Sequence, residues 1–180
     1  MSTLKAKLMD AAAMDRALKR MAHEVIEQIP DPGACVLLGI RRRGIPLAAR
    51  LARYIGQYGG TEPLTGEVDI TFYRDDLSRL AEAPRVSATV LPTDVTGRTV
   101  ILVDDVIYTG RTARAAMEAV LASGRASRVC LAVLIDRGHR ELPIRPDFVG
   151  KNIPTAHTER VSVRVAETDG EDCVLLFETV

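Results

Sequence analysis

Apolar residues occur along the chain in two kinds of pattern. Short runs without a polar face lie at Cys35–Ile40, Val100–Val103 and Val129–Ile135, and such runs are typical of parallel strands covered by helices on both sides. The first two runs are followed by apolar residues at helical spacing, from Ile45 to Ala52 and from Ala113 to Leu121. This alternation predicts an α/β fold with a central, mostly parallel sheet flanked by helices.

The rest of the chain predicts four more elements. Helical spacing of apolar residues indicates a further helix near the start of the chain, and alternating or continuous apolar residues indicate strands. The expected elements are a helix from the N-cap Asp10 to Ile29, a strand at Gly66–Tyr73, and two final strands at Val161–Val165 and Val174–Phe177.

The second apolar run ends in two adjacent carboxylates, Asp104 and Asp105, followed by a turn of glycine and hydroxyl residues. Open α/β sheets bind ligands beyond the carboxyl ends of their strands. The free N–H groups of a helix start, Gly110 and the hydroxyls of Thr109 and Thr112 suit a phosphate. The carboxylates suit ribose hydroxyls, because an ionised carboxylate only accepts hydrogen bonds. The stretch therefore predicts a sugar-phosphate site.

Two other interpretations of this stretch remain open. An ordinary α/β strand can end in acidic residues and a turn, and a phosphate-accepting receiver domain also has an acidic pocket. A receiver domain, however, needs its paired acids near the chain start and a lysine late in the chain, and neither is evident. The helix that follows is expected to start at Thr109–Thr112 and to end at Gly124 in the left-handed conformation.

The thirteen residues from Val100 to Thr112 resemble the 5-phosphoribosyl-1-diphosphate (PRPP) motif of type I phosphoribosyltransferases. In that family the acidic pair holds the ribose 2′ and 3′ hydroxyls, and the following loop wraps the 5′-phosphate. The resemblance implies that Asp104 and Asp105 are catalytic and that Mg²⁺ binds near them through PRPP. It also implies a substrate-binding loop made of Val106, Ile107, Tyr108, Thr109, Gly110, Arg111 and Thr112.

A second ligand loop is expected where the first apolar run meets Arg41-Arg42-Arg43-Gly44. The chain between Ala34 and Gly60 has five arginines and no acid, which predicts a positive field suited to a polyanion. An arginine-rich surface turn is the alternative. Phosphoribosyltransferases bind the pyrophosphate of PRPP with this loop. The resemblance implies a catalytic role for Arg43 and a substrate contact for Arg42, although relatives often have Thr at the latter position.

One phosphoribosyltransferase domain, residues 1–180, is expected to carry two accessory parts. Residues 78–93 contain two prolines and small residues, which favours a mobile arm beside the site. The family resemblance implies a flexible β-arm at about 74–95, with Arg85 meeting the pyrophosphate. It also implies a small cap, or hood, at about 136–160 together with the C-terminal strands, and the chain from Asp136 to Thr155 is expected to be irregular and proline-rich, as suits such a cap. An exposed β-excursion without a chemical role is the alternative for the arm.

Three further segments, residues 69–77, 136–144 and 150–155, resemble the PyrR family of bacterial proteins. PyrR proteins are uracil phosphoribosyltransferases that also regulate pyrimidine genes by binding mRNA. Tyr108 stands where purine-salvage members of the superfamily have an acidic residue. The resemblance therefore implies uracil and UMP as ligands, with Arg137 and Val161 near the base. A purine-base phosphoribosyltransferase is the alternative.

The PyrR resemblance also implies nucleotide-dependent binding to a pyrimidine-operon mRNA leader. The alternatives are that the side chains implied in RNA binding are solvated or face a partner or, for His139 and Arg140, belong to the uracil cap. A regulator with little catalysis is a further alternative. The implied RNA-binding residues are Lys19, His23, His139, Arg140, Arg145 and Lys151, of which Lys19 replaces a Thr of well-known members.

Composition narrows the remaining possibilities. The 180 residues are 47% hydrophobic and 27% charged with a net charge of zero, so any RNA contact must use a local basic patch. Cys35, Cys130 and Cys173 lie in separate apolar runs, which favours buried thiols over a disulfide framework or a metal cluster. The first residues lack the apolar core of a secretory signal, so a cytoplasmic location is expected. The family resemblance implies a homodimer or homotetramer.

Overall fold

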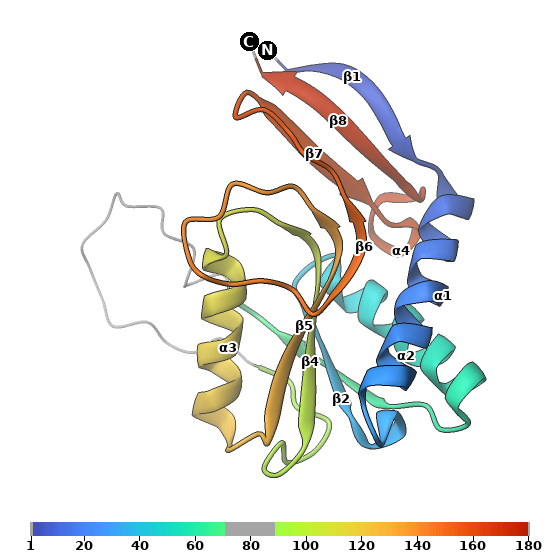
Figure 1. The fold of residues 1–180 in the computed structure, drawn as a ribbon, viewed down its shortest axis with the longest axis vertical. Helices are drawn as coiled ribbons and strands as arrows, with labels where there is room; N and C mark the ends of the chain where they lie inside the picture. The colour runs from blue at the N-terminus through green and yellow to red at the C-terminus, as the bar shows by residue number, and fades with distance from the viewer. Residues whose placement is uncertain (1, 71–88, 180) are drawn as a thin grey trace.

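The computed structural model describes residues 2–70 and 89–179, which form two separate sheets (Figure 1). The main sheet is parallel throughout, in the order β3-β2-β4-β5-β6. Its strands are β2 (Val36–Ile40), β3 (Leu64–Val68), β4 (Thr99–Ile107), β5 (Arg128–Asp136) and β6 (Phe148–Asn152). The helices are α1 (Ala11–Gln28), η1 (Pro32–Ala34, a 3₁₀ turn), α2 (Gly44–Gly59), α3 (Arg111–Ser123) and α4 (Ala166–Asp169).

The central strand β4 is buried on both faces, as its uniformly apolar sequence predicts. Ile101 and Val103 pack into the cluster that contains the inner residues of α1 and α2. Val100 and Leu102 point to the opposite side and pack against α3. Figure 1 shows these layers, with α1 and α2 on one face of the sheet and α3 on the other. This sandwich confirms the α/β architecture expected from the sequence.

A second, antiparallel sheet of order β1-β8-β7 forms a hood over the carboxyl ends of the central strands (Figure 1). It combines β1 (Ser2–Met9), β7 (Glu159–Arg164) and β8 (Cys173–Thr179). The two C-terminal strands were expected, but β1 was not: the apolar and polar residues that alternate from Leu4 to Leu8 indicate a strand, and the sequence analysis did not assign one there. The two ends of the chain therefore lie side by side, with Ser2 opposite Thr179.

Three local predictions are corrected. The acids Asp104 and Asp105 lie within β4 rather than beyond it, because β5 continues alongside and pairs with β4 as far as Ile107. The chain between β5 and β7, expected to be irregular, contains the edge strand β6. Gly124 has φ 164°, which is extended rather than left-handed backbone.

The cysteines have the buried environment that their apolar surroundings predict. Cys35, Cys130 and Cys173 are all free thiols in the interior. Burial raises the pKa of Cys35 to about 11 and also raises the pKa of Cys130. Across residues 2–70 and 89–179, no helix combines the length and hydropathy that crossing a bilayer requires.

Candidate active site at the carboxyl ends of the central strands

Two glycines make the β2–α2 loop tight, because Gly44 packs against β4 and Gly39 packs against the start of α2. A Cβ on Gly44 would lie 2.3 Å from the carbonyl oxygen of Val103, and one on Gly39 would lie 2.4 Å from the Cα of Ile45. Side chains other than hydrogen do not fit at such distances. Because Val103 immediately precedes Asp104, the arginine loop and the acidic pair meet at one end of the sheet.

Both acids are half-buried and are oriented by the adjacent backbone. The N–H of Asp105 donates to Oδ1 of Asp104, and the N–H of Val106 donates to Oδ1 of Asp105, each at 2.9 Å. These bonds hold one oxygen of each carboxylate beside the strand. Asp104 also lines a cavity of about 130 Å³, whose wall includes Thr109 and Thr112.

The turn between β4 and α3 is held by the cap segment, residues 136–147. Three successive carbonyl oxygens of the turn accept hydrogen bonds from this segment. Ile107 accepts from the N–H of Arg137 (3.2 Å), Tyr108 from Nη1 of Arg140 (3.0 Å), and Thr109 from the N–H of Glu141 (2.9 Å). The turn is therefore fixed on one side by the cap, while its other side lines the cavity.

Gly110 occupies a position that requires glycine. Its φ is +94°, and it caps the N-terminus of α3, which begins at Arg111. The first N–H groups of a helix have no partner within the helix, and Gly110, Thr112 and Ala113 line the cavity. This arrangement is a suitable cradle for a phosphate. The helix starts later than the expected Thr109, because the left-handed Gly110 must precede it.

Arg43 is paired with the hood. Its Nε and Nη2 donate to the two carboxylate oxygens of Asp169 at 2.9 and 2.8 Å. The hydrogen bonds from Arg43 lower the pKa of Asp169 below its ordinary value. Arg43 thus connects the β2–α2 loop to α4, and an incoming anion meets a guanidinium already bound to a carboxylate.

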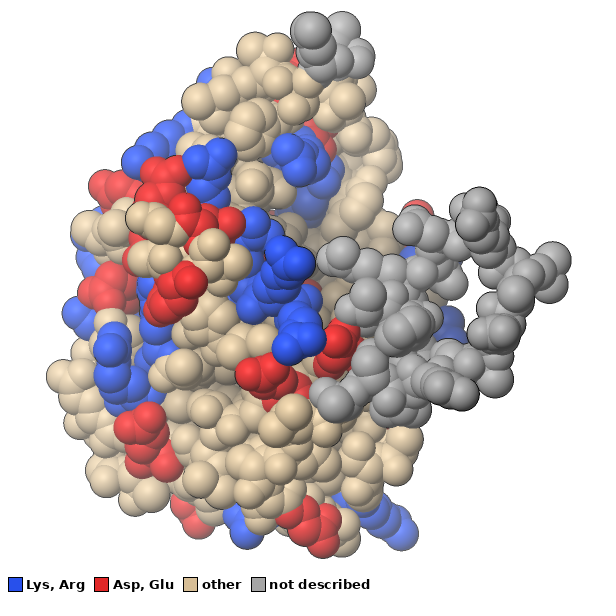
Figure 2. All heavy atoms as spheres, turned by 180° about the vertical axis from the view of Figure 1, so that it is seen from behind, with Lys and Arg blue, Asp and Glu red and all other residues tan. Residues whose placement is uncertain are grey.

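Other arginines of this stretch, Arg41 and Arg42 in the loop and Arg50 on α2, differ in their surroundings. Arg50 forms bidentate pairs with Glu167 and Asp172, and Arg41 donates to Asp69 at 3.0 Å. The positive field expected from the sequence is therefore partly neutralised by acids from distant segments. Arg42 is exposed in the turn between β2 and α2. Figure 2 shows basic side chains gathered beside a hollow on this side of the molecule, with acidic side chains next to them.

Arg137 is the one charged residue that is buried among those described, with 7% of its surface exposed. It donates from Nε to the hydroxyl of Thr155 (3.1 Å) and from Nη2 to the carbonyl of Glu159 (2.6 Å). Its guanidinium lies 4.1 Å from the ring centroid of Tyr108. Arg137 therefore connects the cap, the hood and the β4–α3 turn. Val161 is also buried, with its side chain in the core.

The predicted RNA-binding residues lie on α1, the cap and β6. Arg20 of α1 donates to the carbonyls of Val149 (3.2 Å) and Gly150, which brings the α1 residues close to Lys151. The six residues differ in exposure and partners. His23, Arg145 and Lys151 are exposed, Lys19 pairs with Asp15 at 2.7 Å, His139 contacts the Thr155 carbonyl at 2.6 Å, and Arg140 binds Asp136 at 2.6 Å.

Some predicted features lie outside the described residues. Arg85 and most of the proposed arm, residues 74–88, are among them, as are residues 71–77 of the segment that resembles PyrR. After the gap, Val90 forms an antiparallel bridge with Glu67 of β3.

The sequence analysis did not identify Asp169. Its signal was the acidic segment from Glu167 to Asp172, which complements an arginine-rich, acid-free stretch more than a hundred residues earlier. Charge complementarity between the two segments was available from the sequence, but their proximity was not.

Comparison with known proteins agrees with this geometry. A model of the phosphoribosyl transferase domain matches residues 6–168. The chain is 56% identical to the "Bifunctional protein PyrR" of Thermus thermophilus over 174 residues, covering 97% of this chain and 96% of that protein. It is 55% identical to the protein of the same name from Pelotomaculum thermopropionicum, covering 99% of each.

Solved structures share the fold at low sequence identity. The hypoxanthine phosphoribosyltransferase of Trypanosoma cruzi has a TM-score of 0.74 at 17% identity, covering 98% of each chain. A hypoxanthine-guanine phosphoribosyltransferase from Bacillus anthracis has a TM-score of 0.74 at 17% identity, covering 99% of this chain and 100% of that chain. Fold and sequence together place the chain in the PyrR family of type I phosphoribosyltransferases.

Proposed function

We propose that this protein transfers the 5-phosphoribosyl group of PRPP to uracil, forming UMP and pyrophosphate. The observation that carries the proposal is the meeting of the acidic pair and the α3 phosphate cradle with the β2–α2 arginine loop at one end of the sheet. These three parts match the three polar parts of PRPP, which are its ribose hydroxyls, its 5′-phosphate and its pyrophosphate. The names of the PyrR relatives support the proposal.

In the proposed complex, Asp104 and Asp105 accept hydrogen bonds from the ribose hydroxyls. The 5′-phosphate binds in the turn from Thr109 to Thr112, where backbone N–H groups and hydroxyls converge. Arg42 and Arg43 face the pyrophosphate, and Arg43 must then exchange its contact with Asp169 for the phosphate oxygens or share it between them. Arg85, which lies outside the described residues, is the candidate for a further pyrophosphate contact.

The chemical step needs no covalent enzyme intermediate. A ring nitrogen of uracil forms a bond to C1 of the ribose while the bond from C1 to the pyrophosphate oxygen breaks, and its electron pair leaves with pyrophosphate. The proton of the uracil nitrogen is released to solvent. Positive charge develops on the ribose ring in an oxocarbenium-like state, so the protein acts chiefly by positioning two substrates and by stabilising charge.

Mg²⁺ fits the site as a partner of the substrate. Among the described residues, no three His, Cys, Asp or Glu side chains are grouped so that they alone would hold a metal ion. Two half-buried carboxylates beside a diphosphate are nevertheless typical surroundings for Mg²⁺, which is usually bound by one or two carboxylates plus substrate phosphates. When bound, the ion would neutralise charge on the leaving pyrophosphate. Asp104 and Asp105 would hold it directly or through its water.

The base is proposed to bind between Tyr108 and the cap. Tyr108 is 38% exposed, and Arg137 lies against its ring. The position offers an aromatic surface and no carboxylate, which suits a pyrimidine whose carbonyls and N–H can be matched by backbone groups of the cap. Val161 would contribute through its backbone, because its side chain is in the core.

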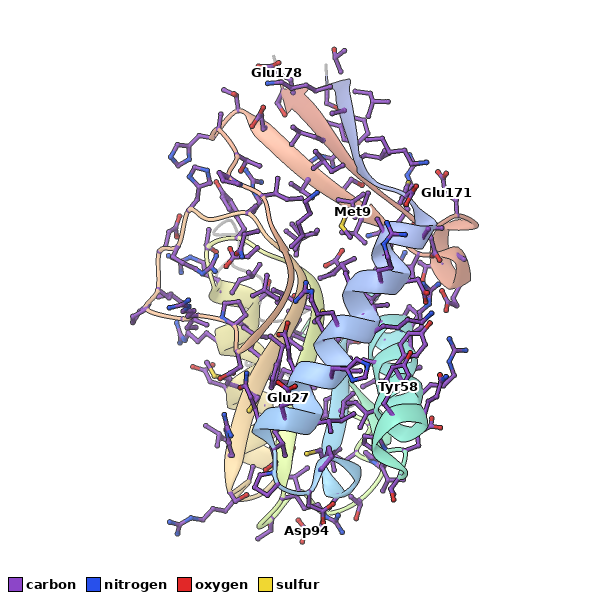
Figure 3. The ribbon with its side chains drawn as sticks, turned by 45° about the vertical axis from the view of Figure 1, so that its right-hand side comes forward. Met9, Glu27, Tyr58, Asp94, Glu171 and Glu178 are labelled. Carbon is purple, nitrogen blue, oxygen red and sulfur yellow. The ribbon has the colours of Figure 1, made fainter. Side chains whose placement is uncertain are left out.

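The direct test is release of pyrophosphate from PRPP and Mg²⁺, with and without uracil. The wild-type protein should form UMP, while Asp104→Asn combined with Asp105→Asn should form none and should keep the wild-type unfolding midpoint. Asp94→Asn is a matched control, because Asp94 is exposed and lies at the opposite end of the sheet (Figure 3). Turnover of hypoxanthine but not uracil, or full activity of the double variant, would contradict the proposal.

We further propose regulation through binding of a pyrimidine-operon mRNA leader. The supporting observation is that the Arg20 contact to β6 brings His23 of α1 close to Lys151 of β6. A gel-shift titration with and without UMP tests this activity. Lys151→Ala should weaken binding to all RNA sequences and reduce the salt slope by about one. Wild-type binding no tighter than to random RNA at matched salt would exclude the regulatory role.

A further inference from the structure

Three aromatic rings form a ladder across the seam between α1 and α2. The rings of His23 and Tyr58 are stacked with centroids 4.3 Å apart and an interplanar angle of 18°. Tyr58 is in turn nearly parallel to Tyr54, at 6.2 Å and 13°. Figure 3 labels Tyr58 where α2 runs alongside α1. We name His23, Tyr58 and Tyr54 the ring ladder.

The outer end of the ladder is not explained by helix packing. Tyr54 is 7% exposed, and its hydroxyl donates to Asp15, so this ring is part of the seam. Tyr58, in contrast, is 37% exposed, and His23 is also exposed. The seam beneath is already closed by apolar side chains such as Leu18. Two stacked rings are therefore presented to solvent on a rigid base.

Cations flank the ladder. The Nζ of Lys19 lies 5.5 Å from the ring centroid of Tyr54, and the Cζ of Arg53 lies 5.2 Å from it. Lys19 also pairs with Asp15, whereas α2 itself contains no acid. Aromatic rings on which bases stack, next to cations that follow a phosphate backbone, are the usual elements of sites for single-stranded nucleic acid.

The ladder is continuous with the proposed RNA surface. His23 lies three residues after Arg20, which places both side chains on one face of α1. Arg20 reaches the carbonyls of Val149 and Gly150, next to the exposed Lys151. A band therefore runs from the rings on α2, over α1, to β6, with lysine or arginine on each of these elements. On α1 these cations are paired with acids, Lys19 with Asp15 and Arg20 with Glu24, whereas Arg53 of α2 and Lys151 of β6 are exposed.

We propose that the outer end of the ring ladder is a stacking platform for one unpaired base of the bound RNA: the base stacks on the outer face of His23, which Tyr58 supports from beneath, with Arg53 and Lys19 beside the RNA phosphates. The inference rests on the proposed RNA binding and adds to it two tyrosines and an arginine on α2. A contact between copies of this chain is the rival occupant of the same surface. RNA is favoured because the rings are bordered by cations and continue into a basic band.

The test uses full-length protein and a leader hairpin RNA that carries 2-aminopurine at each loop position in turn. At one position, wild-type protein and Tyr58→Phe should quench the fluorescence by stacking, and Tyr58→Ala should not. Tyr58→Ala should also weaken binding on the order of tenfold, as expected for the loss of one stacked base. Gln57→Ala is the matched control, because Gln57 is an exposed neighbour on the same helix without a ring.

The outcomes distinguish the failure of the stacking platform from the failure of the proposed RNA binding. If Lys151→Ala weakens RNA binding while Tyr58→Ala, with an unchanged thermal midpoint, binds and quenches like wild type, the platform is refuted and the RNA surface stands. If wild-type protein prefers no leader RNA over random RNA, both proposals fail. If Tyr58→Ala changes the sedimentation coefficient of the protein without RNA, the rings belong to a contact between copies, and the platform is again refuted.

Discussion

Replacing Arg137 by alanine should destabilise the whole protein rather than only weaken base binding. Arg137 is 7% exposed, and its guanidinium joins three parts of the chain. It donates to Thr155 and Glu159, and it lies over the ring of Tyr108. Removal leaves a carbonyl and a hydroxyl without their charged donor and separates the hood from the β4–α3 turn.

The magnitude follows from these contacts. Each hydrogen bond from a charged donor contributes about 1.5–3 kcal/mol, and the cation–π contact adds up to about 2 kcal/mol. Ordering the arginine side chain on folding costs about 2 kcal/mol of conformational entropy, and alanine has no such cost. About 2 kcal/mol is therefore subtracted from the loss expected on replacing Arg137 by alanine. We therefore expect Arg137→Ala to lower the free energy of unfolding by about 1–6 kcal/mol; a mid-range loss of about 3 kcal/mol corresponds to a fall in Tm of roughly 6–12 °C for a chain of this size.

The assay is urea unfolding followed by circular dichroism, with two reference variants. Arg137→Lys retains one cationic donor but not the guanidinium fork, so it should lose about half as much. Arg145→Ala removes an exposed arginine from the same cap and should change stability by less than about 0.5 kcal/mol. If Arg137→Ala were as stable as Arg145→Ala while its KM for uracil rose, Arg137 would act on the base alone, and its role in stabilising the fold would be refuted.

Three further predictions concern other parts of the structure. Gly110→Ala should lower the free energy of unfolding by about 1–2 kcal/mol, because Gly110 has φ +94°, and should raise the KM for PRPP. Gly60→Ala, at φ +91°, should lower the free energy of unfolding and leave the KM unchanged. Urea unfolding and steady-state kinetics measure the two effects. The hydrogen bonds from Arg50 lower the pKa of Asp172 from its ordinary 3.8. The ion pair therefore stabilises the folded protein fully above pH 3.8, and this stabilisation is lost as the pH falls through the lower pKa of the folded state. Arg50→Met should flatten the acid limb of a curve of unfolding free energy against pH, and an unchanged limb would contradict the assignment. Cys35, with a pKa of about 11, should resist thiol reagents at pH 8 until the protein is unfolded, as a spectrophotometric thiol titration in buffer and in guanidinium would report.

The sequence by itself determined the layers of the main sheet and where on the sheet the candidate site is proposed. Uniformly apolar strands such as Val100–Val103 can be buried only between helices, and their alternation with amphipathic helices requires a parallel sheet. The position of the acids, Gly110 and the threonines followed from the same pattern, because ligands bind at the carboxyl ends of such strands. The PRPP motif is local in sequence, so it could be recognised without knowing any long-range contact.

Local patterns failed where long-range partners decide the structure. The strand β1 carries the alternating apolar residues Leu4, Ala6 and Leu8, none of which is fully buried, and its place is decided by the hydrogen bonds that β8 supplies. The edge strand β6 lies in a proline-rich segment and is specified by pairing with β5. The same pairing partner, β5, extends β4 beyond its apolar part to Ile107, so the acids are held within a strand.

Only the tertiary structure decided which charges neutralise one another. The sequence of the β2–α2 loop indicated a positive field, yet Arg43 and Arg50 are paired with acids of the segment from Glu167 to Asp172. The fold also stacks His23 of one helix on Tyr58 of another. Such pairings depend on the three-dimensional distance between residues far apart in the chain, and the energy of a charge or ring contact depends on that distance rather than on sequence separation.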